Sequence, residues 1–127
     1  DYAEAVDWYH KAAEQGFAPA QSILGLIYGD GSYVVQDYAE AADWLRLAAE
    51  QGDATAQYFL GSAYAYGHGV IQDAVIAHMW FNISSANGFD SGSESRSLTE
   101  QFMTLEQIAE AQTLARRCMA SNYQDCD

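Results

Sequence analysis

Two cysteines and three histidines are the side chains in this sequence best suited to metal binding or redox chemistry. Cys118 and Cys126 lie near the end of the chain. A structural zinc site needs about four such ligands at short spacings, but His10, His68 and His78 show no spacing matched to the cysteines. The pair also lacks the C-x-x-C arrangement of redox-active cysteines. The sequence therefore predicts neither a metal site nor any other cofactor.

Motifs for nucleophilic catalysis and phosphate binding are also missing. A serine nucleophile elbow has the form G-x-S-x-G, and the sequence contains none. The glycine-rich stretches 29–31 and 67–69 do not end in the Lys-Ser/Thr pair of a phosphate-binding loop, so we interpret them as turns. Carboxylates are so numerous that a nearby pair would arise by chance. We predict no catalytic residue and no enzyme activity.

The charge balance limits the classes of partner. Five Lys and Arg residues stand against eighteen Asp and Glu residues, a net charge of -13. Such a surface repels nucleic acid and anionic membrane surfaces. No run reaches the roughly 18 apolar residues of a membrane span, and the first residues contain no targeting signal. An acidic surface can attract a basic protein, although it can also serve solubility alone.

The sequence repeats itself with a period of 36 residues. Shifting the chain by this period places residues 1–5, DYAEA, over residues 37–41, which have the same sequence. Residues 12–16, AAEQG, match residues 48–52 in the same way. Such matches at one period are typical of solenoid proteins. One tryptophan recurs at the same place in each unit, as Trp8, Trp44 and Trp80.

Each unit begins with a pattern that predicts an amphipathic helix, which we name helix A. Asp1 can cap its N-terminus, and Glu4 completes a D-x-x-E variant of the capping box, which Asp37 and Glu40 repeat. Gly16 and its equivalents follow the helix, where a residue with positive φ often ends it. The apolar positions of the first unit, spaced as one helix face, are Ala5, Trp8, Tyr9 and Ala12.

The second half of each unit predicts a further helix, helix B. Pro19 is tolerated in its first turn. Gly25 and Gly61 lie inside helix B, where each costs about 1 kcal/mol against Ala. Because both units keep this glycine, we expect neighbouring helices to approach closely there. The apolar face of the first helix B consists of Ala20, Leu24, Ile27 and Tyr28.

The third unit starts in register and then becomes polar, because Arg96 and Glu100 stand where the earlier units have leucine and tyrosine. A last repeat must face water, so we interpret this drift as a terminal cap. Residues 104–107, TLEQ, form a capping box that opens a seventh helix. We predict an all-α superhelical solenoid of antiparallel helix pairs, with repeats 1–36, 37–72 and 73–102 and a capping helix and tail at 103–127. The aromatics expected in its core are Trp8, Trp44, Trp80, Tyr9, Phe81, Tyr28 and Tyr64.

These units resemble the Sel-one-like repeat, a relative of the tetratricopeptide repeat. The resemblance rests on residues 8–16, WYHKAAEQG, and on the Ala-Gln, Leu-Gly and Tyr positions of helix B. It implies an α-solenoid whose helices A line a concave surface that holds other proteins or peptides. Tyr33 departs from the family pattern, because the second unit has Gly69 at that turn position.

Cysteine-rich members of this family, which are secreted, carry disulfides at a spacing similar to that of Cys118 and Cys126. The resemblance therefore implies a disulfide between these two residues. Such staples persist in oxidising compartments, so we expect a periplasmic or secreted location, with the cytoplasm as the alternative.

The candidate partner-binding residues are the helix A positions that the core does not need. His10, Arg46 and Asn82 share one repeat position but differ in type, which suggests an exposed site freed from packing. We therefore expect Arg46 and Asn82 to contact a partner peptide or helix. The full candidate set is Asp7, His10, Lys11, Asp43, Arg46, Leu47, Met79, Asn82 and Ile83.

Two alternatives stay open. Some cysteine-rich relatives are said to bind or hydrolyse peptidoglycan or β-lactams, so a cell-envelope binder or hydrolase is possible by analogy alone. The chain could also be part of a longer solenoid, because Asp1 falls at a repeat boundary. In that case two copies could associate through the uncovered N-terminal face.

Overall fold

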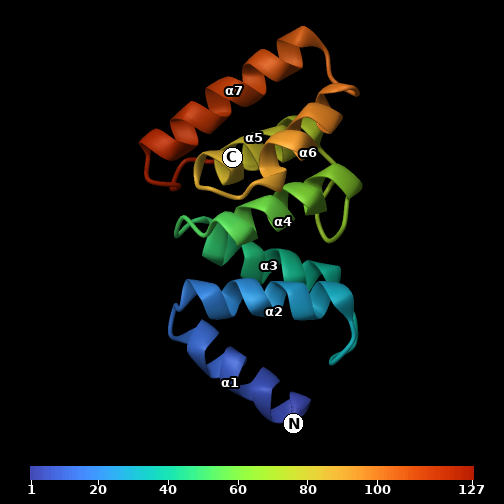
Figure 1. Cartoon of the computed structure of the whole chain (residues 1–127), viewed down its shortest axis with the longest axis vertical. Helices are drawn as coiled ribbons and strands as arrows, with labels where there is room; N and C mark the ends of the chain where they lie inside the picture. Colours follow the sequence, from blue (N-terminus) through green and yellow to red (C-terminus); the bar gives the residue numbers. More distant parts are fainter.

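The computed structural model describes all residues, 1–127, and contains seven α-helices and no strand. The helices are stacked along the long axis of the molecule, from α1 at one end to α7 at the other, with α5 and α6 side by side below α7 (Figure 1). None is long and apolar enough to cross a membrane. The predicted all-α solenoid with a seventh closing helix is confirmed. The helices are α1 (Tyr2–Glu14), α2 (Ala18–Asp30), α3 (Tyr38–Ala49), α4 (Ala54–Tyr66), α5 (Ala74–Ala86), α6 (Ser91–Glu100) and α7 (Leu105–Ala120).

The A helices of the three pairs, α1, α3 and α5, begin with the predicted aspartate caps. Asp37 accepts from the backbone N–H of Glu40 at 3.1 Å, and Asp73 caps α5 in the same way. The predicted glutamate partner in α3 is used differently, because Glu40 accepts from the indole N–H of Trp44 at 3.2 Å. The full capping box forms in α7, between Thr104 and residue 107. Each cap satisfies N–H groups that lack intrahelical acceptors.

A buried glutamine recurs where α2 and α4, the first two helices B, meet the end of their helix A. Gln21 donates to the carbonyl of Ala13 at 3.1 Å, and Gln57 donates to that of Ala49 at the same distance. The next unit adds a second bond, because Gln51 donates to the side-chain oxygen of Gln21 at 2.8 Å. Buried polar groups need such partners, so this ladder fixes the stacking of successive units.

The helix B glycines allow the close approach that their repetition predicted. A Cβ at Gly25 would lie 2.5 Å from Leu45 of α3, and one at Gly61 would lie 2.9 Å from the ring of Phe81 in α5. The backbones of α2 and α4 therefore pack closely against the following helix A, α3 and α5.

The three tryptophans differ in burial although they share a repeat position. Trp80 is fully buried, Trp44 is half-buried against the core between α1 and α2, and Trp8 is 62% exposed. This position faces the preceding helix pair, and no helix of the described chain precedes α1. The prediction of a core role is therefore confirmed for Trp80 and wrong for Trp8.

The two turns between repeats also differ. Gly69 has φ +79°, and a Cβ there would collide with the backbone carbonyl of Tyr38. The first turn has Tyr33 at the equivalent position, and its ring stacks on Tyr2 with centroids 4.3 Å apart. The departure at Tyr33 thus changes the turn and leaves the helix pairs intact.

Candidate interaction surface

The predicted binding residues on the A helices fall into three groups by burial. His10, Arg46 and Asn82 are half-buried. Met79 and Ile83 are fully buried, in the same core cluster as residues of α7. The prediction that these two are free of the core is wrong, because α7 packs on α5 and covers them. The exposed candidates are Asp7, Lys11, Asp43 and Leu47.

The side chains at the variable position shared by His10, Arg46 and Asn82 form hydrogen bonds within the chain. His10 forms a hydrogen bond with the hydroxyl of Tyr28 at 2.9 Å, and Arg46 donates to the hydroxyl of Tyr64. Each residue thus pairs with helix B of its own unit. The expectation of a site freed from packing is wrong here, because His10 and Arg46, although different in type, both contact the tyrosine at one helix B position.

Two polar residues of α6, in the third unit, also contact side chains of α5. Arg96 donates to the side-chain oxygen of Asn82 at 2.8 Å, and Glu100 lies 2.7 Å from Nε2 of the buried His78. Both residues of α6 are half-buried and point to α5. They do not simply face water as a terminal cap would.

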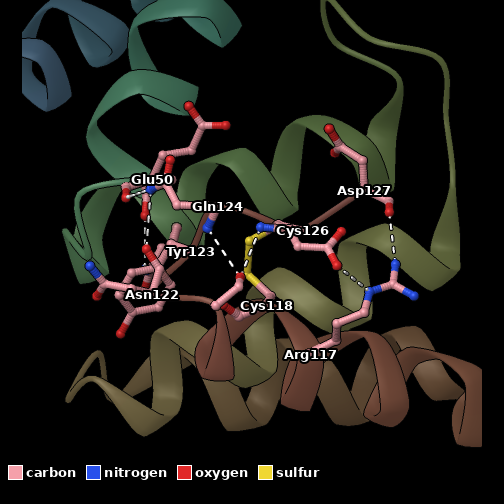
Figure 2. The surroundings of a disulfide bond; sticks show 12 residues. Glu50, Arg117, Cys118, Asn122, Tyr123, Gln124, Cys126 and Asp127 are labelled. Carbon is pink, nitrogen blue, oxygen red and sulfur yellow. Dashed lines mark hydrogen bonds and ion pairs between the residues drawn. A yellow bond between two sulfur atoms is a disulfide. The ribbon is translucent and has the colours of Figure 1, made fainter.

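The residues after α7, 121–127, which we name the return segment, fold back onto the stack (Figure 2). The disulfide between Cys118 and Cys126 is present and buried. Gln124 donates to the carbonyl of Glu50 at the end of α3, at 3.4 Å. The ring of Tyr123 packs over Gly52, where a Cβ would lie 3.1 Å away. The return segment therefore reaches from α7 across to the end of α3.

Two arginines hold the acidic end of the return segment. Arg117 contacts Asp125 at 3.2 Å. It also donates to the backbone carbonyl of Asp127 at 2.8 Å, as Figure 2 shows. Arg46 lies 3.5 Å from the carboxylate of Asp127 and stacks over the ring of Tyr64 at 5.7 Å. Part of the helix A surface is thus already covered by the chain itself. The sequence signal for this contact was weak, since only the cysteine spacing pointed to a fixed tail.

Comparison with known proteins gives the family. The Sel1 repeat model matches residues 1–17, 18–53 and 54–89. The chain belongs to the Sel1 repeat family. The two full matches begin at α2 and α4, so each full Sel1 match joins a helix B to the following helix A.

Two solved Sel1 structures are similar to this chain. A protective antigen of uropathogenic Escherichia coli with an SLR fold is 39% identical with a TM-score of 0.89 over 94% of this chain. This chain spans 27% of that antigen's length. A Sel1 repeat protein from Oxalobacter formigenes is 36% identical with a TM-score of 0.71, covering 75% of this chain and 71% of that one. No curated protein matches the chain. Sel1 repeat proteins generally mediate protein–protein interaction and are typically scaffolds without enzymatic activity.

Proposed function

We propose that this Sel1 repeat chain is a scaffold that binds a basic peptide or helix of another protein along α1 and α3. The supporting observation is the exposure of this part of the helix A surface. Its candidates Asp7, Lys11, Asp43 and Leu47 are exposed, whereas α7 covers the equivalent residues of α5.

The chemistry of the exposed candidates favours a basic partner. Asp7 and Asp43 occupy the same position in successive repeats, so they offer carboxylates at a regular step along the solenoid. Leu47 adds an apolar contact and is 47% exposed. Lys or Arg side chains of a partner would meet these carboxylates, and the net charge of -13 would speed the encounter at low salt. Arg46 can contact a partner only when its ion pair with Asp127 is broken.

A crosslinking experiment tests this surface. A photoreactive residue replaces Leu47 in one variant and Gln112, an exposed residue of α7, in the control. For a protein captured at position 47 and not at position 112, the crosslinked segment would be synthesised as a peptide. Its affinity for the chain would then be measured by titration. Asp43→Lys should weaken binding at least about tenfold, whereas Glu110→Lys, the same charge change on α7, should not. Equal loss in both variants, or equal capture at both positions, would contradict the proposal.

The disulfide supports an oxidising compartment for this protein, which would be periplasmic or secreted. Cytosolic proteins keep such pairs reduced. Thiol counting on protein isolated from its native host distinguishes the compartments: no free thiol agrees with export, and two free thiols contradict it.

The hydrolase alternative and association through the α1 face stay predictions. A chromogenic β-lactam tests the first, and turnover no faster than buffer would dismiss it. For the second, Tyr2 and Trp8 are the exposed aromatics on α1. A mass that rises with concentration and returns to that of the single chain in Trp8→Ser would support pairing there.

A further inference from the structure

Two clefts on the side of the solenoid formed by α2, α4 and α6 are copies of one architectural site. The first has a volume of about 270 Å³ between α2 and α4, and the second about 560 Å³ between α4 and α6. Adding one period to the lining of the first cleft gives most of the lining of the second. Leu45 on the floor of the first corresponds to Phe81 on the floor of the second, and Gly29 on its wall corresponds to Ala65.

An aromatic side chain of the chain itself forms part of the wall of the first cleft. Tyr38 lines this cleft and stacks on His68 with ring centroids 4.3 Å apart. The side-chain amide of Gln36 donates to the hydroxyl of Tyr38 at 3.2 Å and to the carbonyl of Gly29 at 2.8 Å. The lining of the first cleft thus includes a phenol ring whose hydroxyl accepts from Gln36.

The second cleft has a glutamine amide at the equivalent place but an alanine in place of the tyrosine ring. Gln72, the equivalent of Gln36, lines the cleft and donates to the carbonyl of Ala65 at 2.9 Å, which is the same backbone contact one repeat later. Ala74 stands where Tyr38 would be, so no phenol from the chain reaches this amide. The larger volume of the second cleft agrees with this replacement of tyrosine by alanine.

The walls of the second cleft suit an aromatic guest. Tyr58 is fixed by a 2.9 Å hydrogen bond to Ser95 and packs on Phe81 with ring centroids 5.4 Å apart. Phe102 and Leu98 form part of the rim and are 82% and 54% exposed. No charged side chain lines the cleft, although the chain is strongly acidic. Exposed apolar side chains grouped around a cleft mark binding sites.

We propose that the cleft between α4 and α6 binds a tyrosine side chain of a partner polypeptide, with Gln72 donating to its hydroxyl. The guest ring takes the place that Tyr38 holds in the first cleft. This site lies between the B helices α4 and α6, away from the proposed binding surface on α1 and α3. It does not depend on the function proposed for that surface.

A tripeptide, N-acetyl-Gly-Tyr-Gly amide, is the probe. Titration should shift the NMR signals of Ala65, Ala74 and Leu98 with a dissociation constant of about 1 mM, as expected for one buried side chain. Ala74→Tyr refills the cleft from within and should abolish the shifts. Tyr38→Ala opens the first cleft and should add a second set of shifts at Leu26 and Ala42.

The hydroxyl contact is tested with the matched phenylalanine peptide. Wild type should prefer the tyrosine peptide about fivefold, the value of one hydrogen bond, and Gln72→Leu should bind both equally. This comparison decides the matter even where Ala74→Tyr does not fold. Absence of shifts, shifts that survive in a folded Ala74→Tyr variant, or a tyrosine preference that survives in Gln72→Leu would overturn the proposal. So would closure of the cleft by a second copy, seen as a concentration-dependent mass that Phe102→Ser abolishes.

Discussion

The two ends of the solenoid use the same repeat positions with opposite results. Around α1, Trp8 and the candidates Asp7 and Lys11 are exposed. Around α5, the equivalents Trp80, Met79 and Ile83 are buried. The repeat position sets where a side chain points, and the neighbouring element decides whether it is buried.

Trp80 faces the preceding helix pair, whereas Met79 and Ile83 are buried by the elements that follow α5. There α7 and the return segment pack over the helix A side, and the disulfide joins the two. The α1 end has only α2 as a packed neighbour. Among the residues described, α7 and the return segment cover the helix A side of α5, whereas Asp7 and Lys11 on α1 are exposed.

The largest expected difference between the ends is at the shared tryptophan. Trp80→Ala removes a fully buried side chain and should lower the free energy of unfolding by about 3–5 kcal/mol. Trp8→Ala removes an exposed ring that contacts Lys11 and should cost less than about 1 kcal/mol. Urea unfolding followed by circular dichroism measures both, and equal losses would mean that the two ends are not packed as the structure shows.

The end covered by α7 and the return segment should also depend on its disulfide. Replacing both Cys118 and Cys126 by Ala removes a short covalent loop, with an expected loss of about 2–3 kcal/mol in unfolding free energy. Amide exchange should then rise in the return segment and at the end of α3, near Glu50, and stay unchanged in α1. Wild type with reductant should behave as the variant does, and reductant should not affect the variant further. Faster exchange spread evenly over all helices would disprove the local role.

The features that the sequence predicted are those decided within one repeat. Apolar spacing, aspartate caps and the glycines in helix B depend on neighbours a few residues away or in the adjacent helix. Asp37, for example, caps α3 by accepting from the N–H of Glu40 at 3.1 Å, as predicted for an aspartate before a helix. The seven helices could therefore be predicted from local patterns.

The features that the sequence did not predict depend on distant segments. Burial of Met79 needs α7, and the engagement of Arg46 by Asp127 joins residues far apart in the chain. Variation at the position of Arg46 suggested a free surface, but it also fits a position where different polar side chains can contact the same helix B tyrosine, as Arg46 does with Tyr64. A single sequence cannot separate these two causes of variation.

Gly25 and Gly61 lie at equivalent contacts between a helix B and the next helix A. Replacing either glycine by alanine should therefore lower the stability by a similar amount. Gly25→Ala and Gly61→Ala would each force a side chain or ring aside and should lose about 1–3 kcal/mol of unfolding free energy. Gly29→Ala in α2 is the control, because its Cβ would meet Ala41 at an ordinary 3.8 Å. That variant should gain up to about 1 kcal/mol from helix propensity. A loss in Gly29→Ala as large as in Gly25→Ala would remove the steric explanation.

The smallest expected effect concerns the phenol of Tyr28, which lies in α2 near the α1 end of the stack. Burial raises the pKa of Tyr28 above its usual value, and the charges of Glu40 and Asp37 raise it further. A raised pKa means that the folded state favours the neutral phenol, so this stabilisation is fully present below the unfolded pKa of about 10 and is lost as the pH rises through the folded value. Tyr28→Phe cannot titrate, and its unfolding free energy should therefore fall less steeply than that of wild type above about pH 10. Urea unfolding of both proteins at several pH values on each side of this point measures the difference, and parallel curves would show that the phenol is not held in its neutral form.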